Sequence, residues 1–208
     1  MVAFESYARW LLVVHAVLGA ALVASTTHLA VWMRGYLHGR FDRQRGVRLL
    51  GWISSSLFLC TFVFGNLIYP TYRVRVRGEY FESPQAVANA QDARAVAGAA
   101  LMARENRRRT LEHAPDLSEP PSQAYRAESP RHVAKMPRWF DVKEHWVAVG
   151  LAMSIALLCL LTAWNPRKHG ARIAPLVFAL AVGTAATTWF AALVGLVVTS
   201  HRAVGGGG

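Results

Sequence analysis

Four long apolar blocks dominate this sequence and limit what the chain can fold into. They cover approximately residues 10–33, 50–69, 145–164 and 173–200. Each block reaches the ~20 residues that an α-helix needs to cross the ~30 Å hydrocarbon core of a bilayer. We therefore predict an all-α integral membrane protein with four transmembrane helices.

The predicted helices form two hairpins that are separated by a long polar connection. Residues 1–71 contain the first hairpin, residues 72–142 the connection and residues 143–204 the second hairpin. The last four residues, 205–208, are a glycine tail to which we assign no function. The two hairpins are not recognisably similar in sequence, so we do not expect an internal repeat.

Arginine and lysine in the two short loops predict the orientation of the chain in the membrane. Residues 34–48 contain five arginines, and residues 165–172 contain Arg167, Lys168 and Arg172. Such loops are normally cytoplasmic. We therefore expect both termini and the 72–142 connection to be extracytoplasmic, in a bacterial cytoplasmic membrane.

The net charge of +11 does not indicate a nucleic-acid-binding protein. The excess basic residues flank the predicted spans, where they determine topology and contact lipid head groups. Cys60 and Cys159 lie inside the second and third spans, where thiols usually behave as small hydrophobic groups. We expect no nucleic-acid partner and no structural disulfide.

The long connection has three parts. Pro70 should end or kink the second span, and residues 72–81 (YRVRVRGEYF) alternate apolar and charged side chains, which predicts a short extended strand. Residues 85–112 are rich in alanine and predict an amphipathic helix. The proline-rich segment 115–137 predicts an extended arm. A connection of this length favours contact with other membrane protein subunits.

Histidines are the only side chains within the four blocks that can be charged near neutral pH. At ~1.5 Å per residue, His15 lies ~10 Å and His145 ~15 Å from the middle of their spans, both towards the outer face. The two are therefore within one helical turn in depth. Facing histidines from different helices are the usual axial ligands of a b-type haem, so His15 and His145 are the predicted metal ligands. The similarity to small four-helix b-type cytochromes is architectural and depends on these two residues.

Other residues at the outer end have a structural and a functional interpretation. Asp141 and Glu144 fit a capping box that begins the third span, with Asp141 as the N-cap. Glu144 is also a candidate cofactor contact. Arg73 and the tyrosines beside it fit an interfacial aromatic belt, or alternatively a contact with a haem propionate or a quinone.

Two further histidines are weaker candidates for metal ligation. His201 replaces His145 only if the fourth span is shifted inward. His28 is thirteen residues after His15, which leaves the two side chains about 140° apart around the helix. We expect His28 to make a polar contact with a hydroxyl or carbonyl of a neighbouring helix.

Two functions are consistent with these observations. The first is a membrane subunit of a respiratory electron-transfer complex that binds one haem b and relays electrons to or from a quinone or a partner cofactor. The second is a cofactor-free accessory subunit that stabilises and anchors a larger membrane complex. Motifs of phosphate-binding loops, Rossmann enzymes, serine hydrolases and zinc peptidases are absent from the sequence, which favours a non-catalytic subunit.

Overall fold

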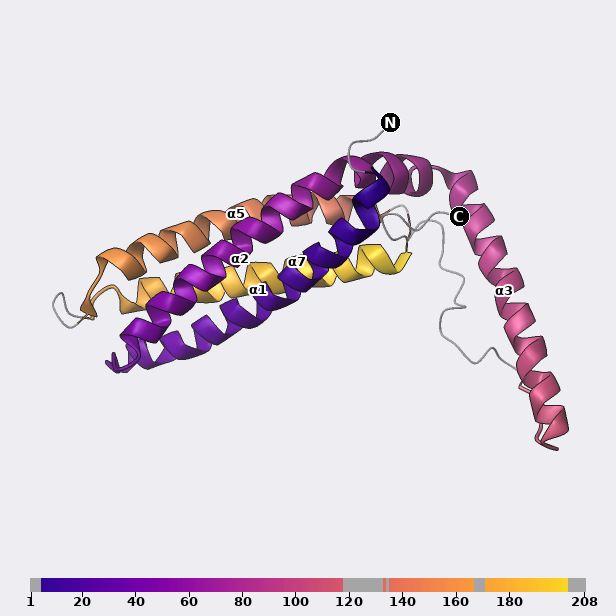
Figure 1. Cartoon of the computed structure of the whole chain (residues 1–208), viewed down its shortest axis with the longest axis horizontal. Helices are drawn as coiled ribbons and strands as arrows, with labels where there is room; N and C mark the ends of the chain where they lie inside the picture. Colours follow the sequence, from indigo (N-terminus) through magenta and orange to yellow (C-terminus); the bar gives the residue numbers. More distant parts are fainter. Residues whose placement is uncertain (1–4, 118–132, 134, 167–170, 202–208) are drawn as a thin grey trace. The chain divides into compact units, whose positions relative to one another are not determined.

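The computed structural model describes residues 5–117, 133, 135–166 and 171–201, and every regular element within these ranges is helical. In chain order the elements are η1 (Glu5–Tyr7), α1 (Ala8–Leu37), α2 (Gln44–Thr71), η2 (Tyr72–Phe81), α3 (Pro84–Leu111), α5 (Met136–Ala163) and α7 (Ala174–His201) (Figure 1). Four helical segments are long and apolar enough to cross a membrane. The prediction of an all-α chain with four long apolar helices that could span a membrane is confirmed.

The chain divides into two compact units. The first, called the bundle here, comprises residues up to Val74 and from Arg138 onwards. It contains all of α1, α2 and α7 and most of α5. The second, called the arm, comprises Arg75–Pro137 and contains α3. The proline-rich segment falls largely within residues 118–132, which lie outside the described ranges.

Side-chain contacts place each helix of the bundle between two neighbours. Hydroxyl hydrogen bonds join α1 to α2, α2 to α5 and α1 to α7: Ser25 to Ser54 at 2.7 Å, Ser55 to Ser154 at 2.9 Å and Thr26 to Thr188 at 3.0 Å. Gly150 of α5 lies against Thr187 of α7. The helices therefore follow the order α1, α2, α5, α7 around the bundle, with α1 diagonally opposite α5.

Inward-facing side chains recur at alternating intervals of four and three residues, and we call these positions the seam of each helix. On α2 the seam contains Val47, Gly51, Ser54, Phe58, Thr61, Gly65, Ile68 and Tyr72, all buried or half-buried. On α1 it includes Ala8, His15, Leu22, Leu29 and Tyr36, at intervals of seven residues. This heptad spacing is typical of left-handed bundles with knobs-into-holes packing.

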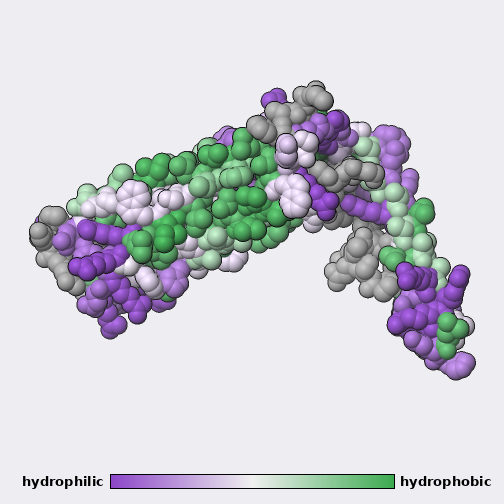
Figure 2. Space-filling model, in the orientation of Figure 1, coloured by the Kyte–Doolittle hydropathy of each residue, from purple (hydrophilic) through white to green (hydrophobic). Residues whose placement is uncertain are grey.

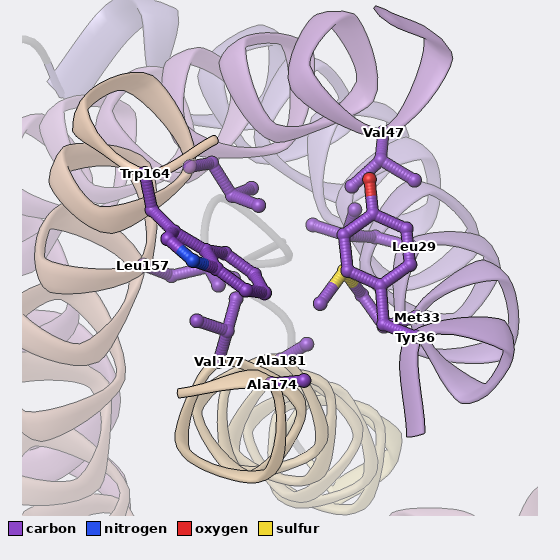
Figure 3. Packing of buried hydrophobic residues seen from close by; sticks show 10 residues of the cluster. Leu29, Met33, Tyr36, Val47, Leu157, Trp164, Ala174, Val177 and Ala181 are labelled. Carbon is purple, nitrogen blue, oxygen red and sulfur yellow. The ribbon is translucent and has the colours of Figure 1, made fainter. Parts of the chain in front are cut away.

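A cluster of buried apolar side chains lies at the end of the bundle near the two short loops. Figure 3 shows Trp164, which directly follows α5, Tyr36 and Met33 of α1, Val47 of α2 and Val177 of α7 directed towards one another. Tyr36 and Trp164 meet edge to face, with ring centroids 6.0 Å apart. Because lipid tails are as apolar as these side chains, close packing and hydrogen bonds must hold the helices together.

The outer surface of the bundle is apolar. Exposed side chains such as Val17, Leu59, Ile155 and Leu196 are distributed over all four helices, and Figure 2 shows the hydrophobic surface along the bundle. Cys60 and Cys159 are exposed free thiols. A surface of this kind is suited to contact with lipid chains.

The prediction of an extended strand at residues 72–81 is wrong, because this segment is the π-helix η2. Alternation with period two also places an apolar residue at every fourth position, so Tyr72, Val76 and Tyr80 share one buried face of the helix. The ion pairs Arg75–Glu79 and Arg77–Glu82 bridge four and five residues along it. Extending an existing helix also avoids the cost of nucleation.

Pro70 does not end its helix. It lies inside α2, and the chain continues as η2 after Thr71. Proline has no backbone N–H, so one hydrogen bond of the α-helix cannot form at this position. This loss accounts for the change to π-helical hydrogen bonding close to Pro70.

The predicted capping box at Asp141 is also wrong. The helix α5 begins at Met136, so Asp141 and Glu144 lie within it. His145 Nδ1 donates to the Asp141 carbonyl at 2.8 Å, a side-chain bond that spans one helical turn. Asp141 therefore continues the helix and does not begin it.

Replacing Gly150 with alanine should destabilise the bundle. A methyl group there would lie 3.0 Å from both Phe58 Cζ and Thr187 Cβ, and it would contact Thr187 Oγ1 even more closely. We expect a loss of about 1–3 kcal/mol in the free energy of unfolding in detergent. Gly19→Ala is the matched control, since nothing lies within 4 Å of a methyl group there. Equal stability of the two variants would contradict the packing described.

Candidate functional site

A layer of polar side chains interrupts the apolar seam near the end of the bundle that is opposite the two short loops. His15 of α1 packs against α2, where a methyl group on Gly65 would lie 3.2 Å from His15 Cε1. The backbone of Thr61, one turn earlier on the same seam, lies near the ring. His15 Nδ1 is buried and has no hydrogen-bond partner among the described residues.

Lys143 of α5 contributes a positive charge to the same layer. Its Nζ would lie 3.7 Å from a methyl group on Gly195 of α7 and is 4.7 Å from the centre of the Phe140 ring. Lys143 lies close enough to His15, and Glu144 close enough to Lys143, for electrostatic interaction between each pair. We call His15, Thr61, Gly65, Lys143 and Gly195 the polar layer.

Aromatic side chains lie beside the polar layer. The Phe140 ring stacks on Tyr72 with centroids 3.9 Å apart and planes inclined by 19°. Tyr69 lies 6.4 Å from each of these rings. Phe140 therefore contacts both the ammonium of Lys143 and the ring of Tyr72, a cation–π arrangement that partly replaces the hydration of the ammonium.

The polar layer combines a hydrogen-bond donor and an acceptor in an apolar bundle. The ammonium of Lys143 can donate to an oxygen, and Nδ1 of a neutral His15 can accept from a hydroxyl group. Ionisable residues inside membrane spans are costly and mark candidate functional sites. This makes the polar layer the strongest candidate site in the bundle.

The two predicted haem ligands have different surroundings. His15 lies on the inward seam of α1, whereas His145 is exposed on α5 and bonds through Nδ1 to the backbone of its own helix. At their shared level, the α5 side chain that turns inward is Lys143. A haem held between His15 and His145 within one bundle does not fit these orientations, because both rings would have to point at the same iron.

The remaining predicted site residues lie around this end of the bundle. Arg73 is exposed, and Glu144 is half-buried next to Lys143. His201 is the last residue of α7, and its side chain lies outside the described part of the structure.

The predicted polar contact of His28 with a neighbouring helix is wrong. His28 is exposed, and its ring lies 4.6 Å from the ring of Trp32 on the same helix. The rotation of about 140° from His15 explains the difference, because it turns His28 away from the seam.

Lys143 was missed by sequence reasoning, although the heptad spacing indicates it. Gly150 and Leu157 of α5 and Trp164 directly after it are buried at intervals of seven, and the next position towards the N-terminus is Lys143. His145 is two residues further along and falls off this stripe. Among the described residues, no cluster of three or more His, Cys, Asp or Glu side chains is arranged to hold a metal ion.

Comparison of the chain with family models, curated proteins and solved structures finds no match. Its function must therefore be argued from its own residues.

Replacing Lys143 with methionine should stabilise the bundle, because methionine keeps the length of the side chain and removes a charge that burial separates from water. We expect a gain of about 1–3 kcal/mol in the free energy of unfolding in detergent. Lys135→Met is the control, since Lys135 is exposed and its replacement should change stability by less than about 0.5 kcal/mol. A lower stability of Lys143→Met would show that the ammonium has a favourable partner.

Proposed function

We propose that this protein is an anchoring subunit of a larger membrane protein complex and that its arm binds a partner subunit. This is the second of the two functions considered from the sequence. The observation that carries it is the helix α3, which the described part of the arm leaves largely uncovered.

α3 has 28 residues, and only Val87 and Gly98 are buried. Its large apolar side chains Val96, Leu101 and Leu111 are 71%, 54% and 80% exposed. Most helices in proteins gain their stability from packing an apolar face against another element. A long helix outside the apolar spans, with exposed valine and leucine, is therefore suited to bind another protein.

The bundle supplies the anchor in this proposal. Its helices pack through their own side chains, and its outer surface is apolar along the spans. The basic short loops favour an orientation with the arm and both termini outside the cytoplasm. The partner would then be an extracytoplasmic domain or loop of another membrane subunit.

Native electrophoresis of membranes solubilised in a mild detergent tests this proposal. The 22.9 kDa chain should migrate in a complex together with at least one other protein. Deletion of the chain should lower the amount of that protein in the membrane, because an unanchored subunit is degraded more readily. Migration of the chain alone, with no other protein affected by its deletion, would contradict the proposal.

A second candidate is a haem b subunit of a respiratory complex that exchanges electrons with a quinone or a partner cofactor. One observation favours it. Metal-ligating histidines usually donate their second ring nitrogen to a carboxylate or a backbone carbonyl, and His145 donates Nδ1 to the Asp141 carbonyl. Nε2 of His145 is then available at the exposed surface of α5, where a neighbouring subunit could supply the second ligand.

A reduced minus oxidised absorbance spectrum of the native complex tests the haem candidate. If His145 ligates a haem at a subunit interface, a b-type band should be present in the wild type and absent from His145→Ala. The same band should persist in His15→Ala, because His15 packs inside the bundle against Gly65. A native complex without such a band would exclude this candidate and leave the anchoring function unaffected.

A further inference from the structure

One face of α3 carries a regular stripe of small side chains. Ala86, Ala90, Ala93, Ala97 and Ala100 recur at intervals of four and three residues. Arg104, Arg107 and Leu111 continue the same spacing towards the C-terminal end of the helix. We call these eight positions the alanine seam. Ala86 and Ala90 are half-buried, and the other six are exposed.

The chain covers a different face of α3. Most of the less exposed side chains of the helix lie on one stripe: Val87, Gln91, Gly98, Met102, Glu105 and Arg109. Ala86, Ala88, Ala90 and Asn106 are half-buried outside this stripe. At ~100° per residue, this stripe is roughly 130° away from the alanines around the helix. The segment after α3 folds back on the helix, since Leu117 N donates to Asn106 Oδ1 at 2.9 Å. The alanine seam is therefore the face that the described chain leaves free.

Charge is distributed differently on the two faces of α3. Arg108 and Arg109 pair with Glu105 at 2.7 and 3.6 Å, and the hydrogen bond from Arg108 holds the pKa of the Glu105 carboxyl below its ordinary value. Arg104 and Arg107 are exposed and form no ion pair within the described part of the chain. Figure 2 shows hydrophilic residues concentrated towards this end of α3. Two positive charges on the alanine seam thus lack an acidic partner.

We propose that the alanine seam binds a helix of a partner protein that presents acidic side chains to Arg104 and Arg107. This inference depends on the proposed anchoring function. The heptad spacing of the alanines matches the seam of a helix pair, and their small side chains allow two helix axes to approach closely. The two arginines then determine the direction and register of the partner helix, because charge complementarity gives specificity at an interface.

A second copy of α3 is a poor partner for this face. The acidic residues of α3 are Asp92 and Glu105, and neither belongs to the alanine seam. Two copies joined through their seams would therefore bury four arginines without a carboxylate between them. Like charges in contact oppose such a pairing.

A membrane surface is also less suitable than a helix. Helices that lie on bilayers insert leucine, phenylalanine or tryptophan from a strongly apolar face. Alanine contributes little, because burial of apolar area yields only about 25 cal/mol per Å². Small side chains limit membrane insertion but favour close contact between helices, so the seam fits a protein partner better.

Tryptophan substitutions in the full-length chain test the inference in native membranes. Ala97→Trp and Ala100→Trp place a large ring on the seam, whereas Ala99→Trp and Ala103→Trp place it on exposed positions off the seam. We expect the seam variants to reduce the amount of co-purified partner at least about tenfold, which corresponds to ~1.4 kcal/mol. The two control variants should retain the partner. Equal retention by all four variants would overturn the inference.

A photoreactive phenylalanine analogue at the same four positions identifies what contacts the seam. Cross-links to one partner protein from positions 97 and 100, absent from positions 99 and 103 and reduced by Arg104→Gln with Arg107→Gln, would support the inference. Cross-links between two copies of this chain would overturn it. So would a tryptophan variant that retains the partner and binds more strongly to lipid vesicles, because that result indicates a membrane surface.

Native electrophoresis of the wild type and the tryptophan variants separates this inference from the anchoring function. If the wild-type chain migrates in a complex and the seam variants remain in it, the anchoring function stands and only the alanine seam is wrong. If the wild-type chain migrates alone, the anchoring function itself fails.

Discussion

Close packing along the helix seams is the constraint on which the rest of this structure depends. Helices in a bilayer do not gain stability by removing apolar side chains from water, because the surrounding lipid is equally apolar. The bundle is held instead by van der Waals contact at small residues, such as Gly150 against Thr187 and Gly51 against Leu161. Hydroxyl pairs such as Ser55 with Ser154 join neighbouring helices between these contacts.

The seams also decide which polar residues face inward. His15 belongs to the seam of α1 and Lys143 to that of α5, so both enter the bundle near the end that is opposite the two short loops. Gly65 and Gly195 accommodate them from the other two helices. His28 and His145 are off the seam and are exposed. The position of a residue around its helix therefore matters as much as its depth in the membrane.

The sequence predicts the four spans correctly because hydropathy over ~20 residues measures the property that membrane insertion requires. It predicts helix ends poorly. The polar residues before Val147 resemble a cap, yet α5 begins at Met136. The alternation in residues 72–81 was compatible with a strand and with a helix, because an apolar residue at every second position also gives one at every fourth position. His15 was recognised from its depth, whereas Lys143 required the heptad spacing and was missed.

The two proposals assign different parts of the chain to different tasks. The bundle holds the protein in the membrane, and α3 extends a basic, alanine-lined face from the arm. The polar layer of His15 and Lys143 lies within the bundle and is independent of that face. The two sites lie in different units of the chain, so each can be tested by its own substitutions.

A structure of the native complex determined by electron cryo-microscopy tests most directly whether the chain anchors a partner through α3. We expect density for a partner helix along Ala93, Ala97 and Ala100, with acidic side chains next to Arg104 and Arg107. A seam open to solvent, in a complex whose other subunits contact only the bundle, would contradict this account.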